Sequence, residues 1–214
     1  TIGAAALFGE TADAGSDGQK TKVYSLTLSG AASGMTDAQN DQAITLAVNA
    51  AGTVVTGSSA GGGTVFTITV DAATGAVTVA QFRAIEHNDS ADHDENGASA
   101  AGMASGLVAL KVVLTDGDND TANDSFDLGS LIKFEDDGPA IDINANAVTI
   151  VLDESVGTGG SVQNEGGAAN NDEAASADTT DIGYATIGAA ALFGETADAG
   201  SDGQKTKVYS LTLP

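Results

Sequence analysis

The stretch Thr64-Val-Phe-Thr-Ile-Thr-Val70, followed by Asp71-Ala-Ala-Thr-Gly75 and Ala76-Val-Thr-Val-Ala80, decides the fold class of this chain. Two runs rich in β-branched residues flank a short segment that ends in glycine. Such a pattern is typical of a β-hairpin, because glycine readily adopts the backbone conformation that a tight turn needs. The sequence therefore predicts an antiparallel pair of strands at 64–80.

Further strand patterns lie on both sides of this hairpin. Residues 22–28 and 43–48 alternate between apolar and polar side chains, whereas 107–114 is more continuously apolar, as in a strand buried on both faces. The remaining expected strands are short and lie at 130–135, 141–143 and 148–152. Turns rich in Gly, Asp and Ser separate these runs without intervening helices, so the sequence predicts an all-β, antiparallel β-sandwich.

The chain contains an internal repeat. Residues 1–28 and 186–213 are identical at all 28 positions, at an offset of 185 residues. Tandem repetition usually provides length, a scaffold or a multivalent surface, because each copy adds the same increment of reach. We therefore expect a segment of a large repetitive protein and not a self-contained enzyme.

The net charge of the chain restricts the classes of partner that it can bind. Asp and Glu number 30 against 7 Lys and Arg, which gives a formal net charge of −23, and Asp outnumbers Glu. Such self-repulsion destabilises a compact state unless something neutralises it, so Asp-rich turns suggest bound hard cations or a high-salt environment. Nucleic acid is not expected as a partner, because its phosphates would be repelled. There is no Cys, and no apolar run approaches the length that spans a membrane.

Several motifs in the order in which they occur resemble one known family. They are Val65–Val79, Ile85-Glu-His87, Val113-Leu-Thr-Asp-Gly-Asp-Asn-Asp120, Phe134-Glu-Asp-Asp-Gly-Pro139 and Leu152-Asp-Glu-Ser155. Together with the repetition, they resemble the tandem extender repeats of type I-secreted RTX adhesins. The resemblance implies immunoglobulin-like sandwiches in series on the bacterial cell surface, stiffened by Ca²⁺ in their linkers and loops. It implies neighbouring repeats as partners, and neither nucleic acid nor membrane insertion.

The resemblance also implies where the domains begin and end. Residues 1–138 would hold most of one sandwich without its opening strand, and residues 139–214 would hold the linker and the first part of the next repeat. The opening strand at 148–152 would then pair with residues 1–138 of a neighbouring chain, as in β-strand addition.

The most regular acidic motif is Asp116-Gly-Asp118-Asn-Asp120, which spaces three carboxylates two residues apart. Alternate side chains of a loop can converge on one cation, and Ca²⁺ takes six to eight oxygen ligands. The EF-hand pattern fails, because Thr121 stands where that loop has Gly and Asp127 where it has Glu. The sequence predicts a Ca²⁺ site with Asp124 as a further candidate ligand, against the alternative of a solvated Asp-rich turn.

A second acidic group lies at the expected joint between repeats. Glu135-Asp136-Asp137 precedes Pro139, and Asp142 follows it. With Ca²⁺ these acids would clamp two domains, and Pro139 would add stiffness, since its φ is fixed. Without a cation they would form a flexible acidic linker. Asp153-Glu154 is a candidate addition to this site or to another.

Other polar clusters have weaker patterns. His87 and His93 with the nearby carboxylates could bind Zn²⁺, and Asp89, Asp92 or Asp94 could bind Ca²⁺, but a structural role for His87 is expected. Glu10, Asp13 and Asp17 lie in a Gly- and Ala-rich stretch that favours a solvated loop over a Ca²⁺ site. Gly57-Ser-Ser-Ala-Gly61 matches the G-x-S-x-G sequence of a nucleophile elbow. That motif needs a helix after it, and a strand is expected here, so no catalytic serine is predicted.

Three functions compete at this stage. The sequence favours a structural, Ca²⁺-stiffened extender of a bacterial surface adhesin. A carbohydrate- or ice-binding module is the alternative, although the chain has few aromatic residues and no regular Thr array. A secreted enzyme fragment is not expected, because identical tandem copies are an unusual way to carry an active site and no carboxylate pair stands out.

Overall fold

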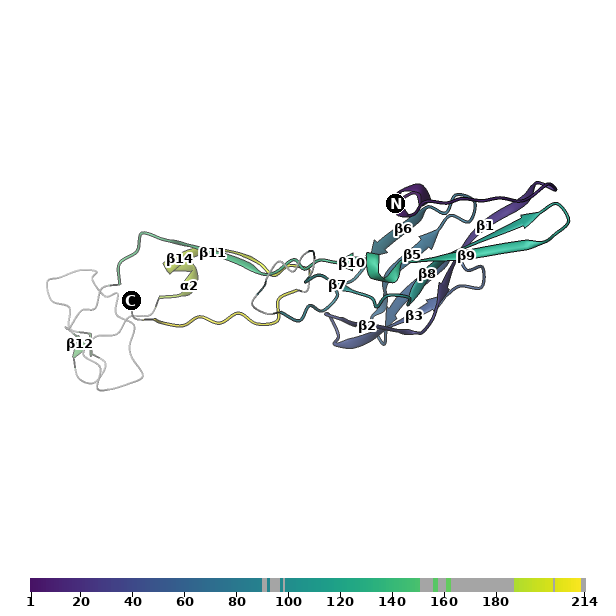
Figure 1. The fold of residues 1–214 in the computed structure, drawn as a ribbon. Helices are drawn as coiled ribbons and strands as arrows, with labels where there is room; N and C mark the ends of the chain where they lie inside the picture. The colour runs from purple at the N-terminus through teal and green to yellow at the C-terminus, as the bar shows by residue number, and fades with distance from the viewer. Residues whose placement is uncertain are drawn as a thin grey trace. The chain divides into compact units, whose positions relative to one another are not determined.

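The computed structural model describes residues 1–89, 92, 97, 99–150, 156–157, 161–162, 187–201 and 203–212 (Figure 1). The chain divides into two compact units. The first consists of Thr1–Pro139 with Ala199–Pro214, and the second of Ala140–Asp198.

One sheet of the first unit is a five-stranded antiparallel meander. Its strands lie side by side in chain order: β2 (Ala32–Asp37), β3 (Gln42–Val48), β4 (Val54–Ser59), β5 (Gly63–Val70) and β6 (Val77–Gln81). The predicted hairpin is β5–β6. Its turn is fixed by Asp71, whose carboxylate accepts hydrogen bonds from the backbone N–H groups of Ala73 (2.9 Å) and Thr74 (2.8 Å). Gly75 follows with a φ of +70°, a conformation that favours glycine.

The second sheet of this unit has the order β1-β8-β9 and is also antiparallel. Its strands are β1 (Gln19–Leu28), β8 (Val108–Asp116) and β9 (Thr121–Asp127). Short elements surround it: the helix α1 (Ala4–Leu7), the 3₁₀ helix η1 (Gly129–Leu131), and the two-residue strands β7 (Ala101–Gly102) and β10 (Lys133–Phe134), which pair with each other.

The apolar faces of the two sheets form one core. The buried side chains of the meander include Ile44, Val55, Phe66 and Ile68, and those of the second sheet are Tyr24, Leu26, Val108 and Leu110. This arrangement confirms the predicted all-β antiparallel sandwich. The expectation that 107–114 is buried on both faces was wrong: only Val108 and Leu110 are buried in β8, and its other side chains are half-buried.

The second unit contains one longer pair of strands. Here β11 (Ala140–Ala145) pairs antiparallel with β14 (Phe193–Asp198), and the helix α2 (Ala189–Leu192) precedes β14. A smaller hairpin joins β12 (Val156–Gly157) to β13 (Ser161–Val162). The expected strand at 141–143 is confirmed within β11. The opening strand expected at 148–152 was wrong in its described part, because 148–150 lies outside any strand; residues 151 and 152 lie outside the described residues.

None of the helices in the described ranges is long or apolar enough to cross a membrane.

Candidate metal centre

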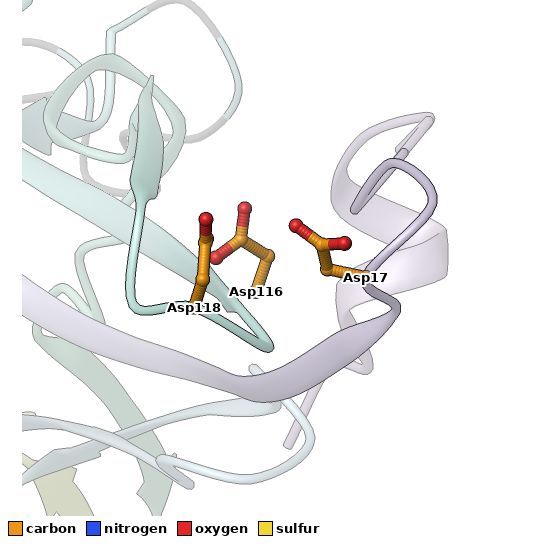
Figure 2. A group of neighbouring side chains, drawn as sticks. All are labelled: Asp17, Asp116 and Asp118. Carbon is orange, nitrogen blue, oxygen red and sulfur yellow. The ribbon is translucent and has the colours of Figure 1, made fainter.

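Three carboxylates gather at one end of the β1-β8-β9 sheet. Asp17 precedes β1, Asp116 ends β8, and Asp118 lies in the turn that follows (Figure 2). One carboxylate oxygen from each lies within 4.8 Å of the others, and this is the one such group of three in the part of the chain that the structure describes. Oxygen ligands at that mutual spacing suit a hard cation such as Ca²⁺.

Backbone hydrogen bonds shape the turn that carries two of these carboxylates. The N–H of Asp116 donates to the carbonyl of Asp120 (3.1 Å), and the N–H of Asp120 donates to the Asp116 carboxylate (2.8 Å). Asn119 has a φ of +81°, which Asn tolerates better than most residues. One Asp116 oxygen thus holds the turn through the Asp120 N–H.

A glycine allows the third carboxylate to approach. A Cβ at Gly117 would lie 2.5 Å from the backbone oxygen of Asp17, which is closer than real Cβ contacts. Any side chain at Gly117 would therefore push the loop of Asp17 away from the turn. The same contact brings a carbonyl oxygen, another potential Ca²⁺ ligand, close to the group.

Within the described ranges, no basic side chain forms an ion pair with the group. The salt bridges of the described residues are Lys22–Glu10 and Arg83–Asp37, and neither involves these three acids. Lys20 is close by, but its Nζ donates to the side-chain oxygen of Asn119. Like charges at this separation repel each other, so a bound divalent cation would stabilise the arrangement.

The other residues predicted as metal ligands are not members of this group of three carboxylates. The Asp120 side chain is not part of it, and Asp124 lies in β9 opposite Val112. Glu135, Asp136 and Asp137 line a polar cleft of the first unit together with Arg83 and His87.

Asp142 belongs to the second unit, where its carboxylate accepts a hydrogen bond from the Asn144 amide (2.9 Å). Asp153 and Glu154 lie outside the described residues, as do His93 and Asp94. The Ca²⁺ clamp across the joint therefore stays a prediction.

Asp17 is the one member of the group that the local motif could not supply. The sequence favoured a solvated loop for it, because it lies in a Gly- and Ala-rich stretch. The signal was the pairing of the strands: Gln19 lies opposite Asp116 in the β1–β8 register, which brings the residues just before β1 to the turn after β8.

Asp127 has a structural role instead of the ligand role that an EF-hand would give it. Its carboxylate accepts hydrogen bonds from the Ser105 hydroxyl (2.6 Å), the Ser130 hydroxyl (3.0 Å) and the Gly129 N–H (2.9 Å). These bonds, first of all that from Ser105, lower the pKa of Asp127 from 3.8 to about 2. Asp127 therefore ties the loop before β8 to η1.

Asp127→Asn should reduce the acid sensitivity of folding. The folded-state pKa of Asp127 lies below the unfolded value, so its contribution is present above pH 3.8 and is lost as pH falls toward 2. After allowance for solvent, we expect the variant to lose about 1–2 kcal/mol near pH 7 and much less near pH 2. Urea unfolding across this range checks the prediction. Asp124→Asn on the same strand is the matched control and should keep the wild-type pH profile; an unchanged profile in Asp127→Asn would contradict the assignment.

A buried ion pair is the other feature that sequence patterns did not indicate. The Asp37 side chain is 0% exposed, and its carboxylate meets Nε (2.8 Å) and Nη2 (3.2 Å) of Arg83. It also accepts hydrogen bonds from the Ser59 hydroxyl and the Gln39 N–H. Burial alone would raise the pKa of Asp37, but these bonds outweigh it and the pKa lies below the ordinary value.

The fold and the acidic group define the class: an all-β sandwich with three carboxylates gathered between two loops at one end of a sheet. The chain belongs to the family described as a domain of unknown function (DUF5801), whose model matches residues 1–129. The matched range includes Asp17, Asp116 and Asp118. No curated protein and no solved structure matches the chain.

Proposed function

We propose that the chain is a structural extender module of a repetitive bacterial surface adhesin, and that Ca²⁺ bound in its acidic loops stiffens it. The observation that carries the proposal is the convergence of Asp17, Asp116 and Asp118, which form no ion pair with a basic side chain in the part of the chain that the structure describes. The exact repetition at an offset of 185 residues supports a role in building length, because each repeat adds a further sandwich to an array.

The physical role of the cation is to offset charge. A net charge of −23 opposes compaction, and this opposition is strongest where acids cluster. Ca²⁺ that binds only the folded state stabilises it by about 2.7 kcal/mol at 100 times the Kd. Extracellular modules often have a Kd of about 10⁻⁴–10⁻³ M, which suits the millimolar calcium outside cells.

The proposed role is mechanical and not catalytic. An extender needs a sandwich that resists deformation and a joint whose angle is held. In this account Glu135, Asp136, Asp137 and Asp142 supply cation ligands at the joint, and Pro139 limits its backbone freedom. The ligand that the whole adhesin binds would be recognised by another region.

Removing calcium from the full chain tests this function. At about 100 times the Kd, Ca²⁺ should raise Tm by about 5–10 °C relative to chelator. Small-angle scattering in the same two buffers should indicate greater flexibility after chelation. Mg²⁺ at equal ionic strength is the control and should give a smaller effect, since Mg²⁺ keeps its waters more strongly. Identical melting and scattering profiles with and without Ca²⁺ would rule out the extender mechanism.

A further inference from the structure

One six-residue sequence occurs twice in the chain with different backbone structures. Phe193–Asp198 forms β14 and pairs with β11 over six residue pairs, from Ala140 opposite Asp198 to Ala145 opposite Phe193. The identical Phe8–Asp13 is not a strand, and it pairs with no strand of the described chain. Because the two sequences are the same, any strand that pairs with one is chemically suited to the other.

The backbone of the first copy is available for pairing. Among the described residues, no backbone–backbone hydrogen bond involves Gly9–Asp13; the N–H of Phe8 is used to end α1. The neighbouring strand β9 pairs only with β8 and also has an open edge. Open edges of this kind are where a further strand adds to a sheet.

A groove lies along this backbone. Its walls come from Phe8–Thr11 on one side and from β8 and β9 on the other, with Leu110, Val112 and Ala122 among the lining residues. Phe8 and Phe126 meet at one part of the groove with ring centroids 5.2 Å apart. The groove thus combines an open backbone edge with a lining that is apolar at Leu110, Val112 and Ala122. The lining is polar at Asn123, Asp124 and Ser125.

The strand β11 has the side chains to fill such a groove. Ile141 and Ile143 are 63% and 59% exposed in the second unit. They stand two residues apart and so project from the same face of β11. Burying that face against apolar side chains would remove both from water.

We propose that the strand Ala140–Ala145 of a second copy of this chain adds antiparallel to Phe8–Asp13, in the register that β11 adopts with β14. Transferred by the 185-residue offset, that register places Ile141 opposite Ala12, Asp142 opposite Thr11 and Ile143 opposite Glu10. The charges agree with this pairing. Asp142 meets a neutral residue, and Glu10 is already paired with Lys22 at 2.6 Å.

The contact is heterologous, because Phe8–Asp13 of one chain receives a different segment of the next. Repeated from chain to chain, such a contact joins the chains head to tail. Within one chain, β14 competes for the same strand at high effective concentration. Release of β11 from β14 should therefore increase the exchange. The inference does not depend on bound cations.

Disulfide trapping between full-length chains tests the register. The protein has no Cys, so one Cys in each of two chains reports a single contact. Thr11 and Asp142 are exposed, and Thr11→Cys mixed with Asp142→Cys should give a cross-linked heterodimer under mild oxidation. The control partner is Asn144→Cys, on the same face but two positions out of register. At about 7–8 Å, such a diagonal pair lies at or beyond the disulfide limit of about 7 Å.

We expect the Thr11–Asp142 pair to give several-fold more heterodimer than the Thr11–Asn144 pair. Adding Thr196→Pro to the Asp142→Cys chain should raise the yield, since proline weakens β14 as the competing strand. Equal yields from the two pairs, no heterodimer, or an unchanged yield with Thr196→Pro would overturn the proposal. Preferential Asp142–Asp142 dimers would overturn it as well, in favour of pairing between two β11 strands.

Discussion

Replacing Arg83 with methionine is expected to lower the free energy of unfolding by about 3–5 kcal/mol, the largest effect of any substitution considered. Asp37 is fully buried, and Arg83 contacts both of its carboxylate oxygens. Methionine has a similar length but no charge, so it would leave a buried carboxylate without its cation. The remaining hydrogen bonds from Ser59 and Gln39 would offset only part of the desolvation cost.

The pH dependence of this effect gives it a distinctive signature. In the wild type the pKa of Asp37 is lowered, so its contribution is present above 3.8 and is lost on acidification. In Arg83→Met the hydrogen bonds from Arg83 no longer oppose the effect of burial, so the pKa of Asp37 should rise. The deficit of the variant should then shrink as pH falls, because the carboxyl becomes protonated and neutral.

Urea unfolding of both proteins at neutral and acid pH measures these expectations. Lys111→Met, on the other sheet, removes one positive charge without touching Asp37, and we expect it to change stability by less than about 1 kcal/mol. Arg83→Lys keeps the charge but loses the two-point contact and should be intermediate. A deficit in Arg83→Met no larger than that of Lys111→Met would show that the pair is not what stabilises this part of the core.

Replacing Asp116 with asparagine should remove the calcium stabilisation that the Asp17–Asp116–Asp118 group supplies and leave the fold intact. Asn keeps a side-chain oxygen that can accept the hydrogen bond from the Asp120 N–H, so the turn should persist. At about 100 times the wild-type Kd, the variant should lack about 2.7 kcal/mol of calcium-dependent stability. In chelator the order should reverse, because the variant has one fewer carboxylate in a group of three that repel each other.

Differential scanning calorimetry measures both differences. The variant should melt below the wild type in calcium and above it in chelator. Gly117→Ala is a second variant that changes no charge: it should displace Asp17 by closing the 2.5 Å approach and so weaken the response to calcium. Asp124→Asn removes an equal charge outside the group and should respond as the wild type does. A full calcium response in Asp116→Asn would contradict the site.

Local sequence predicted some strands because their turns are encoded locally. The β5–β6 hairpin is an example: Asp71 and Gly75 fix its turn through contacts within five residues. The repeated segment shows the opposite case. Residues 19–27 lie in β1 and pair with β8, whereas the identical residues 204–212 form no strand.

The side chains of the two copies differ accordingly. Tyr24 and Leu26 are 3% and 2% exposed, against 55% and 103% for their equivalents Tyr209 and Leu211. The partner strand therefore decides whether this sequence is a strand, and no local pattern can supply that information.

The residues of the candidate site fall into the same two groups: those that local sequence predicts and those that only strand pairing brings together. The spacing of Asp116 and Asp118 predicted a cation site because both lie in one turn. Asp17 reaches them only through the pairing of β1 with β8, and Arg83 reaches Asp37 only through the folding of the meander. Contacts between residues distant in sequence depend on the register of the strands, which composition and spacing do not specify.

Direct measurement of calcium binding shows whether Asp17, Asp116 and Asp118 hold an ion. Equilibrium dialysis or titration calorimetry would count the ions bound by the full chain and by Asp118→Asn at equal ionic strength. We expect the wild type to bind calcium and the variant to bind one ion fewer, with any sites at the joint retained. The same number of ions bound with the same affinity, or no binding by the wild type at millimolar calcium, would contradict it.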